Sequence, residues 1–133
     1  MRVLLDTCTF VWLVSAPDLV PSETRAFLER EPDAVLVSAA SVWELAIKRK
    51  LGKLTEVSSL ARNLAVFVRE AIDTYLFEEL PISTSHAVEA GDLPLHHRDP
   101  FDRMLAAQAQ MEDLLVVSPD LAFDPYQVMR RWD

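Results

Sequence analysis

The chain has 133 residues, half of them hydrophobic, and a formal net charge of −8. This size and composition exclude a disordered chain and favour a single domain over residues 1–133. The two glycines do not sit in a phosphate-binding pattern, which argues against a glycine-rich nucleotide loop. The negative charge has the wrong sign for a nucleic-acid-binding protein, unless the acids gather in one metal site and the bases in a separate patch.

Cysteine content and hydropathy indicate a cytoplasmic protein without a membrane segment. The one cysteine, Cys8, cannot form an internal disulfide, as is typical of a reducing compartment. The N-terminal stretch has an arginine and an apolar run, like a signal peptide, but Asp6 interrupts the run early. No stretch approaches the roughly 20 apolar residues that a membrane span needs.

Apolar runs and turn residues predict strands that alternate with helices. We expect strands at 2–5, 34–39 and 114–118 and a short strand within 77–83. We expect helices at 9–16, 22–31, 41–51, 58–75, 84–93 and 99–112, while the pattern of the last twelve residues is ambiguous. Continuously apolar strands of this kind predict an α/β fold with a central parallel sheet covered by helices on both faces.

Acidic residues follow the predicted strands, where open parallel sheets bind their ligands. Asp6 ends the first strand, Asp120 follows the last, and Glu44 stands early in the helix after the second. Asp99 and Asp102 open the helix that leads into the last strand, in the segment RDPFDRMLAAQAQ. Carboxylates that converge repel one another and favour a hard divalent cation between them, Mg²⁺ or Mn²⁺. Cysteine and histidine are not spaced as in a zinc site.

Each of these acids also has a local structural explanation. Asp99 before a proline is a good helix N-cap, and Asp120 lies in a Ser-Pro-Asp turn. Glu44 is spaced from Ser41 as in a capping box. Taken singly, these explanations equal or outweigh a functional one, but their coincidence at successive strand ends favours a site. Within it, we expect Asp99 to act mainly as the cap and Asp102 to be the better metal ligand.

Basic residues adjoin this predicted site. A basic run follows Glu44 along its helix and comprises Lys48, Arg49, Lys50 and Lys53. It is either a solvated helix end or a contact for a phosphate backbone beside the metal. Arg103 follows Asp102 and is expected to pair with Asp99 or with phosphate. Trp43 is expected to belong to the hydrophobic core rather than to stack on bases.

Four segments resemble those of PIN-domain proteins and, more narrowly, of VapC-type toxins from bacterial and archaeal toxin–antitoxin pairs. They are LLDTCTFVW, SAASVWELAIKRKLGKL, LPLHHRDPFDRMLAAQA and LLVVSPD, and they occur in the family's order along nearly the whole chain. The second and third are specific motifs. The family's acids correspond to Asp6, Glu44, Asp102 and Asp120, with Asp99 as an additional acid. Ser118 stands where relatives commonly have threonine.

The resemblance implies a compact PIN-like three-layer fold and an endoribonuclease activity that depends on Mg²⁺ or Mn²⁺. It also implies a cognate VapB-like antitoxin and a homodimer. The acids would hold one or two ions, with Asp120 completing the site and Thr7 or Ser118 supporting the carboxylates from behind. The basic run and Arg103 would contact the RNA.

Two other functions remain open at this stage. An aspartyl-phosphate phosphatase also begins with LLDT, but it requires a second aspartate at the position of Cys8 and a later lysine at a strand end. A non-catalytic regulatory domain could use the acids to hold an ion. Receiver domains of that class have paired acids after the first strand, which this chain lacks.

Overall fold

The computed structural model describes residues 1–54, 63–96 and 98–133. Its strands are β1 (Arg2–Leu5), β2 (Ala34–Ser38), β3 (Glu78–Leu80), β4 (Leu115–Val117) and β5 (Arg130–Arg131). Its α-helices are α1 (Thr7–Ser15), α2 (Ser22–Arg30), α3 (Ala39–Lys50), α5 (Leu64–Tyr75), α6 (Thr84–Asp92) and α7 (Pro100–Glu112). Two 3₁₀ segments, η1 (Pro17–Leu19) and η2 (Leu121–Tyr126), complete the described elements.

The strands form one parallel five-stranded sheet in the order β3-β2-β1-β4-β5. From β1 the chain adds β2 and β3 on one side and then returns to add β4 and β5 on the other. The order therefore reverses between β1 and β4, and crevices at such reversal points are where open α/β sheets bind ligands.

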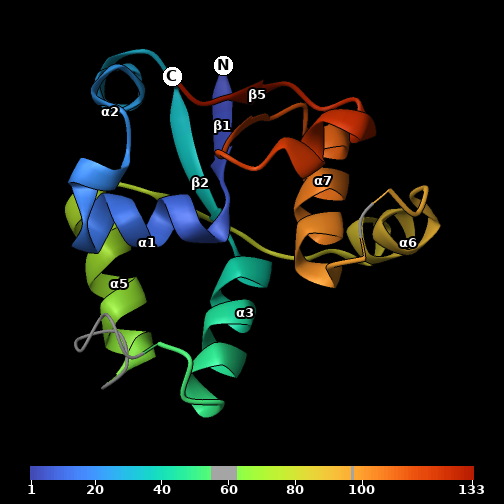
Figure 1. Cartoon of the computed structure of the whole chain (residues 1–133), viewed down its shortest axis with the longest axis horizontal. Coiled ribbons are helices and arrows are strands. Elements are labelled where there is room, and N and C mark those ends of the chain that lie inside the picture. The colour runs from blue at the N-terminus through green and yellow to red at the C-terminus, as the bar shows by residue number, and fades with distance from the viewer. Residues whose placement is uncertain (55–62, 97) are drawn as a thin grey trace.

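Apolar side chains alternate between the two faces of the sheet and form two cores. Leu4 and Val116 pack with α6 and α7, whereas Leu5 and Val117 pack with α1, α2 and α5. Figure 1 shows α6 and α7 on one side of the sheet and α1, α2 and α5 on the other. This arrangement confirms the predicted α/β fold with a central parallel sheet and three layers.

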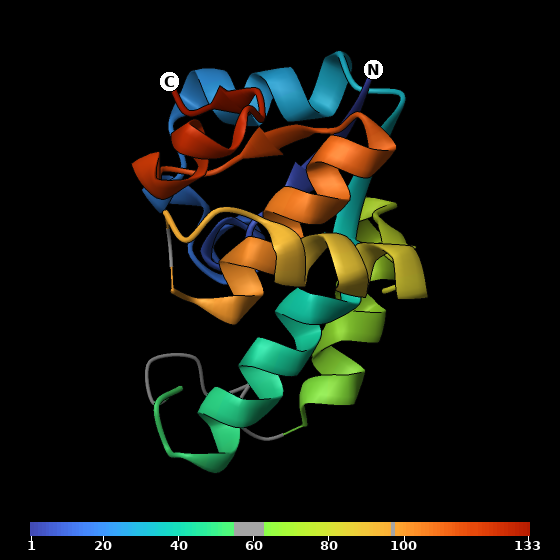
Figure 2. The same ribbon diagram turned by 90° about the vertical axis from the view of Figure 1, so that its right-hand side faces the viewer.

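Helix α3 begins earlier than the sequence pattern predicts. Ser38, the last residue of β2, caps it and accepts a hydrogen bond from the Ala40 amide, so Ser41 lies inside the helix. The predicted capping box of Ser41 and Glu44 is therefore wrong, and Glu44 has no capping role. Figure 2 shows α3 and α5 extending together beyond the sheet at the end opposite the two chain termini.

Other expectations are confirmed or corrected in part. Helix α5 agrees with the second part of the predicted helix 58–75, whose beginning lies outside the described residues. The ambiguous C-terminal segment contains η2 and the short edge strand β5. Trp43 does not belong to the core, because 60% of its surface is exposed. Within the described residues, none of the helices is both long and apolar enough to cross a membrane.

Candidate active site

The predicted acids lie where β1, β2 and β4 end and the helices α1, α3 and α7 begin. Asp6 follows β1 directly and is 5% exposed, and Glu44 on α3 is 8% exposed. Asp99 and Asp102 lie at the start of α7, and Asp120 precedes η2. The sheet thus brings acids from five separate positions in the sequence to its carboxyl edge. We call these five residues the carboxylate site.

Asp6 combines a capping role with a second contact across the sheet. Its Oδ1 accepts a hydrogen bond from the Thr9 amide at 2.9 Å and caps α1. Its Oδ2 accepts a hydrogen bond of 2.5 Å from the hydroxyl of Ser118, which follows β4. Ser118 is fully buried, and its oxygen also accepts from the Asp120 amide at 2.9 Å. Ser118 therefore connects Asp6 with Asp120 across the reversal point of the sheet.

Glu44 is held from two sides. Thr7 donates its hydroxyl proton to Oε1 of Glu44 at 2.6 Å, while Oε2 lies 2.9 Å from the ammonium nitrogen of Lys48. The Thr7 oxygen also lies 3.0 Å from the Ser41 hydroxyl, and because Thr7 has a single proton to give, Ser41 is the donor in that contact. The predicted supporting role of Thr7 thus has a direct structural basis.

The acids of RDPFDR differ in their local roles. Asp99 caps α7 by accepting hydrogen bonds from the amides of Phe101 and Asp102 through Oδ1, at 2.9 and 3.4 Å. Asp102 lies within the first turn of the helix and is partly buried. Asp99 is therefore the N-cap that the sequence predicts, and Asp102 follows it in the first turn of α7.

Burial and neighbouring acids raise the pKa of Asp102 to about 7. Desolvation is the largest cause, followed by the negative charges of Asp99, Asp120, Glu44 and Asp6. All four other acids of the site thus lie close enough to Asp102 to oppose its ionisation. Five carboxylates around one partly buried position form a strongly negative environment that a cation would relieve.

The oxygen ligands of the carboxylate site are of the kind that binds a hard divalent cation, but their side chains are not placed to hold one together. Carboxylate and hydroxyl oxygens are the ligands that Mg²⁺ and Mn²⁺ prefer. In the part of the chain that the structure describes, no three His, Cys, Asp or Glu side chains are arranged closely enough to hold a metal ion. Ligation of one ion by three of these acids would therefore require their side chains to rotate toward one another.

The predicted basic run does not act as one surface. Lys48 is paired with Glu44, whereas Arg49, Lys50 and Lys53 are exposed. Lys53 lies after the end of α3, at the rim of a separate groove described below. Lys48 is therefore the member of the run that directly contacts the carboxylate site.

Arg103, for which the sequence predicts pairing with Asp99 or phosphate and a contact with RNA, is largely buried in the structure. It is 9% exposed, and its guanidinium donates hydrogen bonds to backbone carbonyls at the end of α6 and in the following loop. The accepting oxygens belong to Ala90, Gly91, Leu93 and Pro94, at 2.8 to 3.2 Å. These bonds fasten the loop before Asp99 to α7, and the buried guanidinium is turned toward protein rather than toward a substrate.

A buried polar network behind the site could not be seen in the sequence. Gln108 on α7 is fully buried, accepts a hydrogen bond from the Ser38 hydroxyl at 2.6 Å and donates to the Pro81 carbonyl at 3.2 Å. His86 is also buried; its Nδ1 accepts from the Ser83 amide, so its Nε2 donates to Glu112 at 2.9 Å. The network fixes α7 against the end of β2. In the sequence, only the presence of polar residues within helical patterns hints at it.

Cys8 lies close to Asp6 but is not suited to be a nucleophile. Its sulfur is 3.5 Å from both carboxylate oxygens of Asp6. Burial, followed by the negative charge of Asp6 and the hydrogen bond to it, raises the pKa of the thiol to about 12. The thiol therefore stays protonated at neutral pH.

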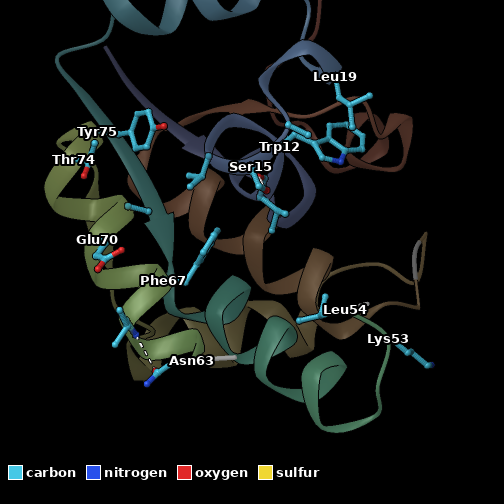
Figure 3. A pocket seen from close by; sticks show the side chains of 15 residues that line it. Trp12, Ser15, Leu19, Lys53, Leu54, Asn63, Phe67, Glu70, Thr74 and Tyr75 are labelled. Atoms are coloured by element: carbon cyan, nitrogen blue, oxygen red, sulfur yellow. Dashed lines mark hydrogen bonds between the residues drawn. The ribbon is translucent and has the colours of Figure 1, made fainter. Parts of the chain in front are cut away.

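A large groove lies away from the acids. It is a groove of about 800 Å³ between α1 and α5, lined by residues such as Trp12, Phe67 and Tyr75. Figure 3 shows these side chains from α1 and α5 along its walls, with Leu54 and Lys53 at one end. The groove contains none of the five acids, so it is not the place for the chemistry that the carboxylate site supports.

Comparisons with known proteins agree with this architecture. Chains of similar fold occur in the crystal structure of VapBC2 from Rickettsia felis bound to a promoter DNA fragment, with 17% identity, a TM-score of 0.70 and full coverage of both chains. DNA-bound VapBC from Salmonella typhimurium shares 20% identity at a TM-score of 0.72, over 98% of this chain and 97% of that one. FitAcB from Neisseria gonorrhoeae shares 22% at 0.67, over 98% and 96%.

The sequence itself identifies the family. The comparison with curated proteins found no significant match. The PIN domain, in contrast, matches residues 3–127, which include every acid of the carboxylate site. The chain therefore belongs to the PIN-domain family.

Proposed function

We propose that the protein is a VapC-like toxin, an endoribonuclease that requires Mg²⁺ or Mn²⁺ and hydrolyses RNA phosphodiester bonds. The observation that carries the proposal is the carboxylate site around Asp102, at the reversal point of the sheet, where burial and four further acids raise the pKa of the Asp102 carboxyl to about 7. The PIN-domain match and the fold shared with chains of VapBC complexes support it.

The side chains would divide the work according to their contacts. Asp6, Glu44 and Asp102 would hold the metal, with Asp99 as an additional ligand. Asp120 would complete the site or orient the attacking water. Ser118 and Thr7 would keep Asp6 and Glu44 in place through their short hydrogen bonds.

When bound, the ion would supply a nucleophilic water at neutral pH and stabilise charge on the reacting phosphate. This chemistry does not need the RNA 2′-hydroxyl as a nucleophile. The expected products therefore carry a 3′-hydroxyl and a 5′-phosphate. Ends with 2′,3′-cyclic phosphates, formed equally well with EDTA present, would contradict the proposal.

The acidic character of the chain is consistent with a basic protein partner. We expect a VapB-like antitoxin whose cationic side chain enters the carboxylate site, because a cation there would both compete with the metal and block RNA. We also expect a cytoplasmic homodimer. The solved complexes of similar fold contain VapB together with VapC, which supports an antitoxin of that kind.

A phosphatase that forms an aspartyl-phosphate is the weaker alternative. Such an enzyme needs a second carboxylate at the position of Cys8, where the structure has a protonated thiol. A regulatory domain that binds an ion without catalysis is distinguished from the nuclease only by experiment.

The test is cleavage of RNA by the Asp6→Asn variant. The amide keeps the oxygen that caps α1 but removes the charge, so we expect the fold to persist and the cleavage rate to fall by at least about 1,000-fold. Growth arrest on expression should disappear in parallel. The matched control is Asp73→Asn, at an exposed position on α5. Full cleavage by the Asp6 variant would disprove the proposed function.

A further inference from the structure

The Glu44 carboxylate has a charged partner on its own helix. Lys48 stands four residues after Glu44, one helical turn along α3, and their nitrogen and oxygen are 2.9 Å apart. The Glu44 side chain is 11% exposed and that of Lys48 is 44% exposed. With Thr7 on its other oxygen, Glu44 has both of its oxygens occupied within the protein.

This pairing has a clear electrostatic reason. A nearly buried carboxylate without a counterion is costly, and Glu44 is also one of the acids that oppose ionisation of Asp102. The ammonium of Lys48 compensates part of that negative charge. Lys48 thus contacts a carboxylate that would help to hold the metal ion in the proposed enzyme.

A divalent ion and Lys48 cannot both occupy Glu44 Oε2 favourably. Two like charges near one oxygen repel each other strongly in a site of reduced dielectric constant. Lysine has a long flexible stem, and with its side chain nearly half exposed it can move its ammonium into water at little cost. The Glu44 carboxylate, in contrast, is restrained by the short hydrogen bond from Thr7, which itself contacts Ser41.

We propose that Lys48 is an exchangeable counterion, which holds Glu44 when the site lacks a divalent ion and leaves it when the ion binds. This inference rests on the proposed function. The sequence predicts that Lys48 contacts RNA, but an ammonium paired with Glu44 is not available to phosphate. The exchange would allow both contacts, one before and one after the ion binds. Release by the metal would free the ammonium at the edge of the site, so that metal loading prepares the RNA contact.

The test is Mn²⁺ binding to the full chain without RNA, measured by isothermal titration calorimetry. Lys48→Met removes the competing cation, and we expect the Mn²⁺ dissociation constant to fall by about tenfold. A merely structural role for Lys48 would predict weaker binding instead. Lys48→Gln, which keeps a polar donor for Glu44 without the charge, should bind Mn²⁺ more tightly in the same way and guards against misfolding of the methionine variant.

Two controls isolate the contact. Lys50→Met makes the same change in net charge on the same helix, but Lys50 is not spaced three or four residues from Glu44 as facing side chains are, and its Mn²⁺ affinity should stay within about twofold of the unmodified protein. Lys48→Arg should also leave the affinity nearly unchanged. In a double-mutant cycle, Lys48→Met should have no further effect once Glu44→Gln is present.

The outcomes separate this inference from the proposed function. Mn²⁺ binding by the unmodified protein, with equal affinities in the Lys48→Met and Lys50→Met variants, would overturn the role of Lys48 alone. Failure of the unmodified protein to bind Mn²⁺ at all would overturn the metal-dependent function and this inference with it. Tighter binding by both Lys48 variants, and not by Lys50→Met, is the result we expect.

Discussion

Asp102 and Arg103 are consecutive residues of α7, yet they belong to opposite electrostatic environments. Asp102 faces four other acids, and their charges and its burial make its ionised form unfavourable. Arg103 is buried among backbone carbonyls that accept its hydrogen bonds. The acids around Asp102 repel one another, and a bound cation would reduce that repulsion. The Arg103 guanidinium, in contrast, already has hydrogen-bond acceptors within the protein. Charge and burial alone therefore do not identify a functional residue; the balance of its partners does.

Removing the Arg103 guanidinium should change the free energy of unfolding more than neutralising Asp102. Arg103→Met leaves the carbonyls around it without their donor, and we expect the free energy of unfolding to fall by about 3–5 kcal/mol. Urea unfolding followed by circular dichroism measures this. Arg98→Met, at an exposed position in the same motif, is the control and should change stability by less than about 0.5 kcal/mol. Equal stability of the two variants would mean that the arginine contacts contribute little.

Neutralising Asp102 should instead increase the free energy of unfolding. The pKa of Asp102 in the folded protein, at about 7, lies above the ordinary aspartate value of 3.8. The folded protein therefore binds this proton more tightly than the unfolded chain, and stability should decline as pH rises from about 4 to 7. At pH 8 without metal, Asp102→Asn should be more stable than the unmodified protein by about 1–2 kcal/mol after allowance for solvent screening.

The difference in stability between the unmodified protein and Asp102→Asn should depend on pH and on metal. At pH 4 the stability difference between Asp102→Asn and the unmodified protein should nearly vanish. Mg²⁺ should stabilise the unmodified protein at pH 8 and have a much smaller effect on the variant. Equal destabilisation of the variant at both pH values would show that Asp102 is held by favourable contacts rather than opposed by its neighbours.

Substitution of Cys8 should have the smallest effect on stability and on activity. Its thiol stays neutral beside Asp6, so Cys8→Ala should alter stability by less than about 1 kcal/mol and leave RNA cleavage within about twofold. Alkylation by iodoacetamide at pH 8 should be far slower than that of an ordinary thiol, because so little thiolate is present. A large loss of cleavage in the alanine variant would assign the thiol a direct role and would favour a covalent mechanism.

The parts of the fold that depend on local pattern were predictable. The apolar runs of β1, β2 and β4 and the Asp99 cap of α7 carry their signals within a few residues. The start of α3 was predicted wrongly because Ser38 and Ser41 are both suitable caps, and the choice depends on where β2 ends in the sheet. The two residues of β5 are too short to give a periodic signal.

The site was predictable in its acids but not in its electrostatic partners. Strand ends locate Asp6, Glu44 and Asp120 because a parallel sheet aligns them, whatever their distance in sequence. The partners of Arg103 are backbone carbonyls, which have no residue-type signature, and so its neighbours in the motif suggested a phosphate instead. Trp43 was placed in the core on hydrophobicity alone, although it lies on an exposed side of α3.

The double use of the capping aspartates has a consequence for mutational scanning. Asp6, Asp99 and Asp120 each bind a backbone amide at a helix start through one oxygen, Oδ1. Asparagine retains such an oxygen, whereas alanine does not. A scan that selects only for folded protein should accept asparagine and penalise alanine at these positions, while a scan that selects for toxicity should reject both. The gap between the two scans at asparagine would therefore measure how much of each acid's role resides in its charge.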